Sequence, residues 1–227
     1  MEHVNVGTAQ SATSAEIQKV LRNTYMLLGM TLAFSALTAG ISMSMNLGGG
    51  AAMIMSIAAL ALVWFVLPRT ANTAMGLPVV FLFTGLLGAA LGPMLNRYLA
   101  LPNGSEMVMQ ALGGTAVIFF SLSAYVLTTK KDFSFMGGFL FAGLMVVIVG
   151  AIGAMVASYF FGVDVSLFSL ALSGAIVLLM SGLILFDTSR IINGGETNYI
   201  MATVGLYLNI YNLFTALLHI IGATSDD

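Results

Sequence analysis

The chain has 227 residues, of which 59% are apolar and only 7% are charged. Because a soluble domain carries about a quarter charged residues, this composition indicates a membrane protein. The net charge of −2 comes without a basic patch, which argues against a nucleic-acid partner, and the absence of cysteine excludes disulfides and thiolate catalysis.

The first segment, residues 1–18, is polar and nearly free of large apolar side chains. Such a segment cannot bury enough surface to order itself. We therefore expect a flexible cytoplasmic N-terminal tail over 1–18 and a transmembrane domain over 19–227. Two interpretations of the tail are open, an ordinary frayed terminus and a handle for a partner.

Long uncharged intervals between the charged residues predict seven transmembrane helices, since a span needs about 20 apolar residues. The alternating pattern of barrel strands is absent, and a helix satisfies its own backbone hydrogen bonds in lipid. The expected fold is therefore all-α and polytopic. The predicted spans are 24–45, 51–68, 77–97, 107–128, 136–161, 165–187 and 199–222.

The basic residues predict the orientation of these helices. With the N-terminus in the cytoplasm, six of the seven lysines and arginines face the cytoplasm and only Arg97 lies outside. An odd number of spans then places the C-terminus on the outer side. The first apolar run exceeds the roughly 7–15 residues of a signal-peptide core, so we expect a retained helix.

The third predicted helix carries Gly85, Gly88 and Gly92 on one face, at spacings of three and four. Small residues let helices approach closely in lipid, so close packing is the favoured interpretation. Pro93 removes a backbone donor and is expected to kink this helix near its outer end. A kink of this kind could also serve as a gate.

The seventh predicted helix is the most polar. Asn209 and Asn212 share a helical face with Gly205 and Ala216. Amides at membrane depth need hydrogen-bond partners, so this helix is expected to lie centrally in the bundle rather than face lipid. His219 is interpreted as an interfacial histidine near the outer surface.

Asp187 follows the apolar run of the sixth predicted helix and is placed at its cytoplasmic end. The C-terminal carbonyls of a helix make the potential there negative, so the carboxylate opposes the helix dipole. An acid near the membrane is by default a candidate functional residue. The alternative is that the helix ends a residue or two earlier and that Asp187 forms a solvated ion pair with Arg190.

Several segments together resemble the Bax inhibitor-1 (transmembrane Bax inhibitor motif) family, and within it the bacterial branch that modulates the FtsH protease. The resemblance runs from about Lys19 to the C-terminus. The segments that carry it are GLLGAALGPMLNRYL, GGTAVIFFSLSAYVLTTKKDFSFMGG, LFDTSRIINGGETNYI and LYLNIYNLF.

This resemblance implies a fold in which six helices wrap the last one, and a location in the bacterial inner membrane with the C-terminus in the periplasm. Members of the bacterial branch bind the AAA protease FtsH, are slowly degraded from the N-terminal tail, and restrain degradation of other membrane proteins. Other members act as pH-sensitive calcium leaks, in which an aspartate closing helix six forms a latch with an aspartate of helix seven.

The latch transfers only in part to this sequence. Asp187 matches the first aspartate, but Asn209 stands at the second position. Two carboxylates that share a site can sense pH because they cannot both ionise cheaply, whereas an amide can only donate to the ionised acid. We therefore expect a latch contact between Asp187 and Asn209, with Asn212 nearby, and a weakened or absent pH switch.

Three classes of function can be ranked on these observations. The resemblance favours a regulatory protein that binds the FtsH complex, with a calcium or cation leak as the alternative. Calcium normally takes six to eight oxygen ligands, and the predicted spans contain no row of acids. No catalytic motif, metal motif or cofactor motif is evident, and His219 has no evident serine partner, so an enzyme is disfavoured.

Overall fold

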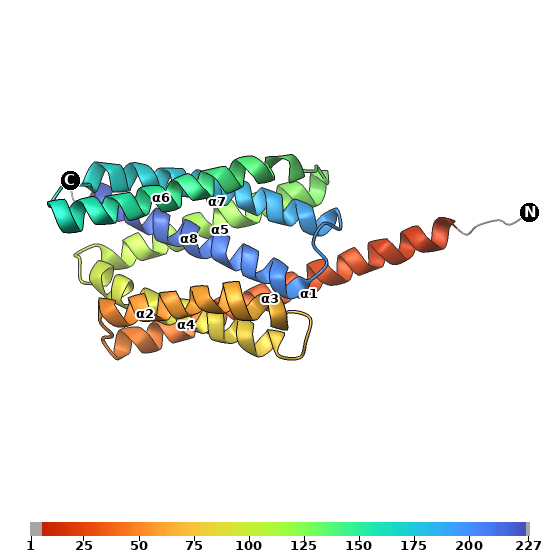
Figure 1. The fold of residues 1–227 in the computed structure, drawn as a ribbon, viewed down its shortest axis with the longest axis horizontal. Helices are drawn as coiled ribbons and strands as arrows, with labels where there is room; N and C mark the ends of the chain where they lie inside the picture. Colours follow the sequence, from red (N-terminus) through yellow and green to blue (C-terminus); the bar gives the residue numbers. More distant parts are fainter. Residues whose placement is uncertain (1–5, 226–227) are drawn as a thin grey trace, which may run out of the picture. The chain divides into compact units, whose positions relative to one another are not determined.

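The computed structural model describes the backbone of residues 6–225 and the side chains of residues 14–225. Within that range the chain is helical without strands, and seven helices are long and apolar enough to cross a membrane, which confirms the predicted fold class (Figure 1). The elements are α1 Val6–Ser44, α2 Gly49–Ala61, η1 Leu62–Val66, α3 Leu67–Thr70, α4 Gly76–Leu99, α5 Gly104–Thr129, η2 Ser134–Met136, α6 Gly137–Phe161, α7 Ser166–Ile192 and α8 Tyr199–Ser225.

The first helix starts well before the predicted boundary at residue 24, because α1 already begins at Val6. Helix therefore covers part of the range 1–18 that the sequence predicts as a flexible tail, and residues 1–5 lie outside the described residues. The mobility of the tail stays a prediction. From Ser14 to Ser44 the helix has 31 residues, and at about 1.5 Å per residue it is about 46 Å long, more than the roughly 30 Å of hydrocarbon.

The second span consists of three consecutive helical segments, α2, η1 and α3, rather than one regular helix. In the π-helical η1, the Leu67 amide donates to the Leu62 carbonyl, five residues back. Pro68 follows directly and has no amide hydrogen, and its ring would press on the carbonyl four residues earlier. The wider π turn accommodates this proline, as insertions of this kind do in other helices.

The chain forms two compact units, and the first contains residues 1–93 and 189–207. Its α1 and α4 pack closely through the predicted glycine face. A methyl group on Gly88 would overlap the Ser35 carbonyl, and one on Gly92 would overlap the Ser42 hydroxyl. Only glycine leaves room for this approach, so α4 lies directly against the backbone and the small polar side chains of α1.

A buried tyrosine joins three helices of the first unit. The Tyr207 hydroxyl on α8 lies 2.7 Å from the Ser35 hydroxyl on α1 and donates to the Thr84 carbonyl on α4 at 3.3 Å. Its ring packs edge-on against Phe83, with centroids 5.6 Å apart. Tyr207 is only 1% exposed. These partners therefore provide the hydrogen bonds that its hydroxyl needs and that lipid could not provide.

The second unit contains residues 94–188 and 208–227, which include α5, η2, α6 and most of α7. Here too glycines admit neighbouring side chains: a methyl group on Gly182 of α7 would lie 2.7 Å from Leu140 of α6, and one on Gly143 would lie 2.9 Å from Leu179. The most apolar window of α6 is only 11% buried. Large apolar side chains on its open sides suit contact with acyl chains.

Burial of α8 is much greater than that of α6. Half of its most apolar window, 50%, lies inside the protein, although α8 has the lowest mean hydropathy of the seven spans. This burial supports the expectation that lipid does not reach its polar side chains. The arrangement of the other six helices around α8 stays a prediction, and so does the kink at Pro93, where α4 continues as a helix to Leu99.

The glycine contacts between α1 and α4 lead to a test of stability. We expect Gly88→Ala to lower the free energy of unfolding by about 1–3 kcal/mol, because the added methyl group cannot fit against the Ser35 carbonyl. Gly40→Ala is the matched control, since nothing lies within 4 Å of its added methyl group. Thermal unfolding in detergent measures both, and equal melting temperatures would contradict the packing.

Candidate functional site

The candidate site is a contact between α7 and α8 within the second unit. The Asn209 side-chain amide donates a hydrogen bond of 2.7 Å to the Asp187 carboxylate. Asn209 is 5% exposed and Asp187 is partly buried. A hydrogen bond to an ionised acceptor is short and strong, and a poorly hydrated position strengthens it further.

The prediction that Asp187 closes its helix is wrong, because α7 continues to Ile192. The alternative of an even earlier helix end is also wrong. The continuation has an apolar cause: Ile184 and Ile191, seven residues apart on one face, are 0% and 1% exposed. Burial of Ile191 therefore favours continuation of the helix beyond the Asp187 carboxylate.

A glycine ends α7 instead. Gly194 has a positive φ of 74°, and the Gly195 amide donates to the Arg190 carbonyl at 2.8 Å, as at many helix C-termini. Asp187 therefore lies more than a turn inside the helix, where the opposing dipole is weaker than predicted. Arg190 forms an ion pair with Glu196 at 3.6 Å and donates to the Gly195 carbonyl.

The two asparagines of α8 behave differently. Asn209 reaches across to α7, whereas Asn212 donates to the Leu208 carbonyl of its own helix at 2.8 Å. The sequence places both residues on one face and gives no signal that separates them. Asn209 is the residue that connects helices, and the part of Asn212 in any ion pathway stays a prediction.

A second polar contact holds the loop between α7 and α8 and was missed in the sequence analysis. In the first unit, the Asn198 amide donates to the Asn72 side-chain oxygen at 2.7 Å and to the Ala71 carbonyl at 3.1 Å. Its carbonyl oxygen accepts from the amide of Ile200 at 2.9 Å, which caps α8. An asparagine just before an apolar helical run was the available signal for this cap.

His219 has a serine partner, contrary to the sequence analysis. Its Nδ1 lies 2.9 Å from the Ser173 hydroxyl oxygen. The Ser173 hydroxyl also lies 3.0 Å from the Ser169 carbonyl, and the tautomer of His219 decides which group donates in the serine–histidine pair. The pair links α7 to α8 within the second unit.

Metal ligands do not converge in the described part of the chain. Among residues 14–225, no three side chains of histidine, cysteine, aspartate or glutamate come together as a metal site would require. At the candidate site, the Asp187 carboxylate and the Asn209 amide form a helix–helix contact.

The fold and this contact define a polytopic helical membrane protein whose last two helices are joined by a carboxylate and an amide. The family model described as “Inhibitor of apoptosis-promoting Bax1” matches residues 17–226. The chain therefore belongs to the Bax inhibitor family, as the resemblance in the sequence predicted.

Relatives of similar length span nearly the whole chain. The “Modulator of FtsH protease YccA” of Escherichia coli K12 is 50% identical over 209 residues, which cover 92% of each chain. An uncharacterized membrane protein of Vibrio cholerae is 50% identical over 220 residues, 97% of this chain and 96% of its own. An uncharacterized protein of Pseudomonas aeruginosa is 48% identical over 216 residues, 95% and 94% of the two chains.

The strength of the contact between Asp187 and Asn209 can be measured with a double-mutant cycle. We expect Asn209→Ala to lower the free energy of unfolding by about 1–3 kcal/mol, because the carboxylate loses a buried donor. Combined with Asp187→Ala, it should show a coupling energy of about 0.5–3 kcal/mol in a reversible unfolding assay in micelles.

Asn212→Ala provides the matched control, since this amide bonds within its own helix. Paired with Asp187→Ala, its effect should be additive to within about 0.5 kcal/mol. Additive effects for Asn209 as well would contradict a latch contact.

Proposed function

We propose that this protein binds the FtsH protease complex in the bacterial inner membrane and modulates the degradation of other membrane proteins. The observation that carries the proposal is the 50% identity, over 92% of both chains, to a relative named as a modulator of that protease. A relative from another Escherichia coli strain is named an inner membrane protein. Seven apolar helices agree with such a location.

The proposed mechanism combines an accessible end with a resistant body. An AAA protease pulls on a flexible end, which the N-terminal tail would supply in the cytoplasm. Behind it, α1 packs on α4 at glycine contacts, and the buried hydroxyl of Tyr207 holds α1 to α8. A chain that is engaged readily and extracted slowly would occupy the protease and delay its action on other substrates.

The distribution of basic residues supports the orientation that this mechanism needs. A cytoplasmic N-terminus places Lys19, Arg22, Arg69, Arg190 and the pair at 130–131 on the same side of the membrane. The C-terminus then lies in the periplasm. FtsH would reach the tail only in this orientation.

Deletion of residues 2–13 tests the tail as a handle. This change leaves every described side chain of α1 in place. We expect the deletion to lengthen the protein's half-life severalfold in cells with active FtsH and to have no effect in cells without it, as measured by pulse-chase. Less FtsH should also be captured with the shortened chain.

A flexible Gly/Ser segment of equal length is the control for sequence-specific effects, and it should restore turnover because such segments remain disordered. An unchanged half-life of the deletion variant in cells with active FtsH would contradict the handle.

The contact between Asp187 and Asn209 supports a second candidate, a calcium or cation leak with weakened pH gating. Its 2.7 Å hydrogen bond joins the last two helices, and breaking it would free α7 from α8 at this point. An amide does not titrate, so this contact lacks the shared proton of a carboxylate pair.

Asn209→Asp tests this candidate directly. The variant brings two carboxylates together, and such a pair shares a proton near neutrality because both cannot ionise cheaply. We expect calcium flux into liposomes to depend steeply on pH between about 5 and 8 in the variant and only weakly in the natural chain. Asp187→Ala should remove the pH dependence of the variant. A steep rise near neutrality in the natural chain would contradict the weakened switch.

A further inference from the structure

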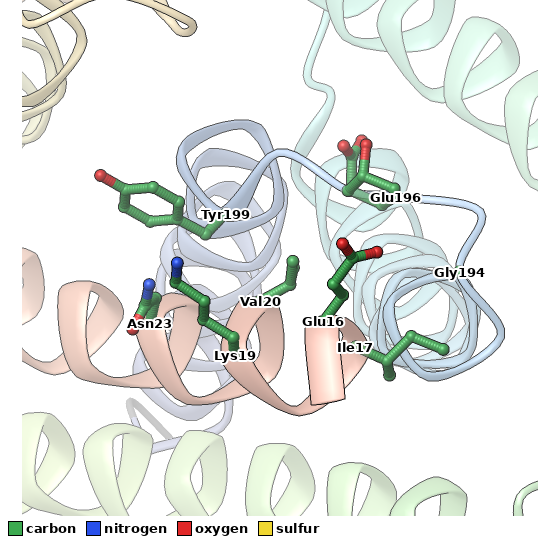
Figure 2. A pocket seen from close by; sticks show the side chains of 9 residues that line it. Glu16, Ile17, Lys19, Val20, Asn23, Gly194, Glu196 and Tyr199 are labelled. Carbon is green, nitrogen blue, oxygen red and sulfur yellow. The ribbon is translucent and has the colours of Figure 1, made fainter. Parts of the chain in front are cut away.

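A pocket of about 390 Å³ lies in the first unit, between residues 16–23 of α1 and the loop that leads into α8 (Figure 2). It is separate from the contact between Asp187 and Asn209, which belongs to the second unit. Three charged side chains share it with polar and apolar neighbours. The lining residues are Glu16, Ile17, Lys19, Val20, Asn23, Gly194, Glu196, Thr197 and Tyr199.

The charges in this pocket are separated instead of neutralising one another. In Figure 2 the Lys19 ammonium lies toward Tyr199, whereas the Glu16 carboxylate lies toward Glu196. Within residues 14–225, neither Lys19 nor Glu16 forms an ion pair or a hydrogen bond through its side chain. The pocket therefore presents a cationic region and an anionic region to the same ligand.

Glu196 is held in place by the protein and can still accept further hydrogen bonds. One carboxylate oxygen lies 3.6 Å from Arg190, and the other accepts from the backbone N–H of Asn198 at 2.9 Å. A carboxylate has about four acceptor positions, so these contacts orient Glu196 and leave acceptor positions for further hydrogen bonds. On the cationic side, the Asn23 amide adds donors beside Lys19.

The length of α1 favours a position of the pocket at the level of phospholipid headgroups. The 31 residues from Ser14 to Ser44 exceed the length of a span, and Glu16 and Lys19 belong to the polar end of that helix. About 20 residues suffice for the hydrocarbon, so part of this stretch is expected to lie beyond it, and the charged residues favour the N-terminal part. Ile17 and Val20 supply apolar surface next to the charges.

We propose that this pocket binds the headgroup of a zwitterionic phospholipid with a primary ammonium, as in phosphatidylethanolamine. Lys19 and Asn23 contact the phosphate, and Glu16 and Glu196 accept hydrogen bonds from the ammonium. An ammonium has three donors for these carboxylates, whereas a quaternary choline group has none. An anionic headgroup would leave Glu16 without a cationic partner and place a negative charge beside it.

Lipid binding to the purified full chain tests this proposal. The protein is delipidated in detergent and titrated with phosphatidylethanolamine, phosphatidylcholine, phosphatidylglycerol and free phosphoethanolamine, with bound ligand counted by native mass spectrometry. Phosphatidylethanolamine should bind at least about tenfold more tightly than the other three ligands. Lys19→Ala and Glu16→Gln should each reduce its affinity by about tenfold, since each removes a charge-assisted contact.

The controls use the same residue types outside the pocket. Lys131→Ala and Glu106→Gln change exposed side chains and should leave the affinity unaltered. The pocket side chains Lys19 and Glu16 are exposed and make no side-chain hydrogen bond or ion pair within residues 14–225, so their two variants should unfold at the temperature of the natural chain when lipid is absent.

Three results would overturn the proposal. Unchanged phosphatidylethanolamine affinity in both pocket variants would show that this lipid does not bind in the pocket. Tighter binding of phosphatidylglycerol would show that the pocket selects an anion. Equal affinity for free phosphoethanolamine would assign it to a soluble ligand instead of a lipid.

Discussion

The strongest constraint on this fold is that lipid offers no hydrogen-bond partner to a polar side chain. The hydrogen bond from the Asn209 amide to the Asp187 carboxylate supplies such a partner from within the protein. A carboxylate inside a helix of an apolar bundle requires a donor from another element. Asn209 supplies that donor, and its own burial at 5% exposure follows from the same need. The pairing of α7 with α8 thus depends on polar chemistry, whereas the pairing of α1 with α4 depends on the absence of side chains at Gly88 and Gly92.

The number and type of helices could be predicted from the sequence because a charge at membrane depth is costly, so charges mark most of the connections. The same reasoning placed the end of α7 wrongly. It predicts a boundary at Asp187, but the buried face of Ile184 and Ile191 continues beyond this residue and Gly194 ends the helix. A charge marks the end of a span only where no neighbouring helix can supply a partner for it.

Side-chain partners were less predictable than spans, because they depend on which helices meet. Helical periodicity placed Asn209 and Asn212 on one face, yet one bonds to α7 and the other to its own helix. His219 lacked a partner along the sequence, but Ser173, on the preceding helix, lies 2.9 Å from its ring. The family resemblance located Asp187 and Asn209 together, while the residues alone gave no distance between them.

The position of Tyr207 and Asn209 on α8 ties the latch contact to the stability of the whole helix. Tyr207 bonds to Ser35 in the first unit, and Asn209 bonds to Asp187 in the second. Because an α-helix is a rigid rod over so short a distance, a rotation of α8 about its axis moves both side chains together. Opening the contact at Asp187 by such a rotation would also strain the buried tyrosine hydroxyl, for which lipid offers no alternative partner. A rotation of α8 would therefore break two hydrogen bonds at once, one in each unit.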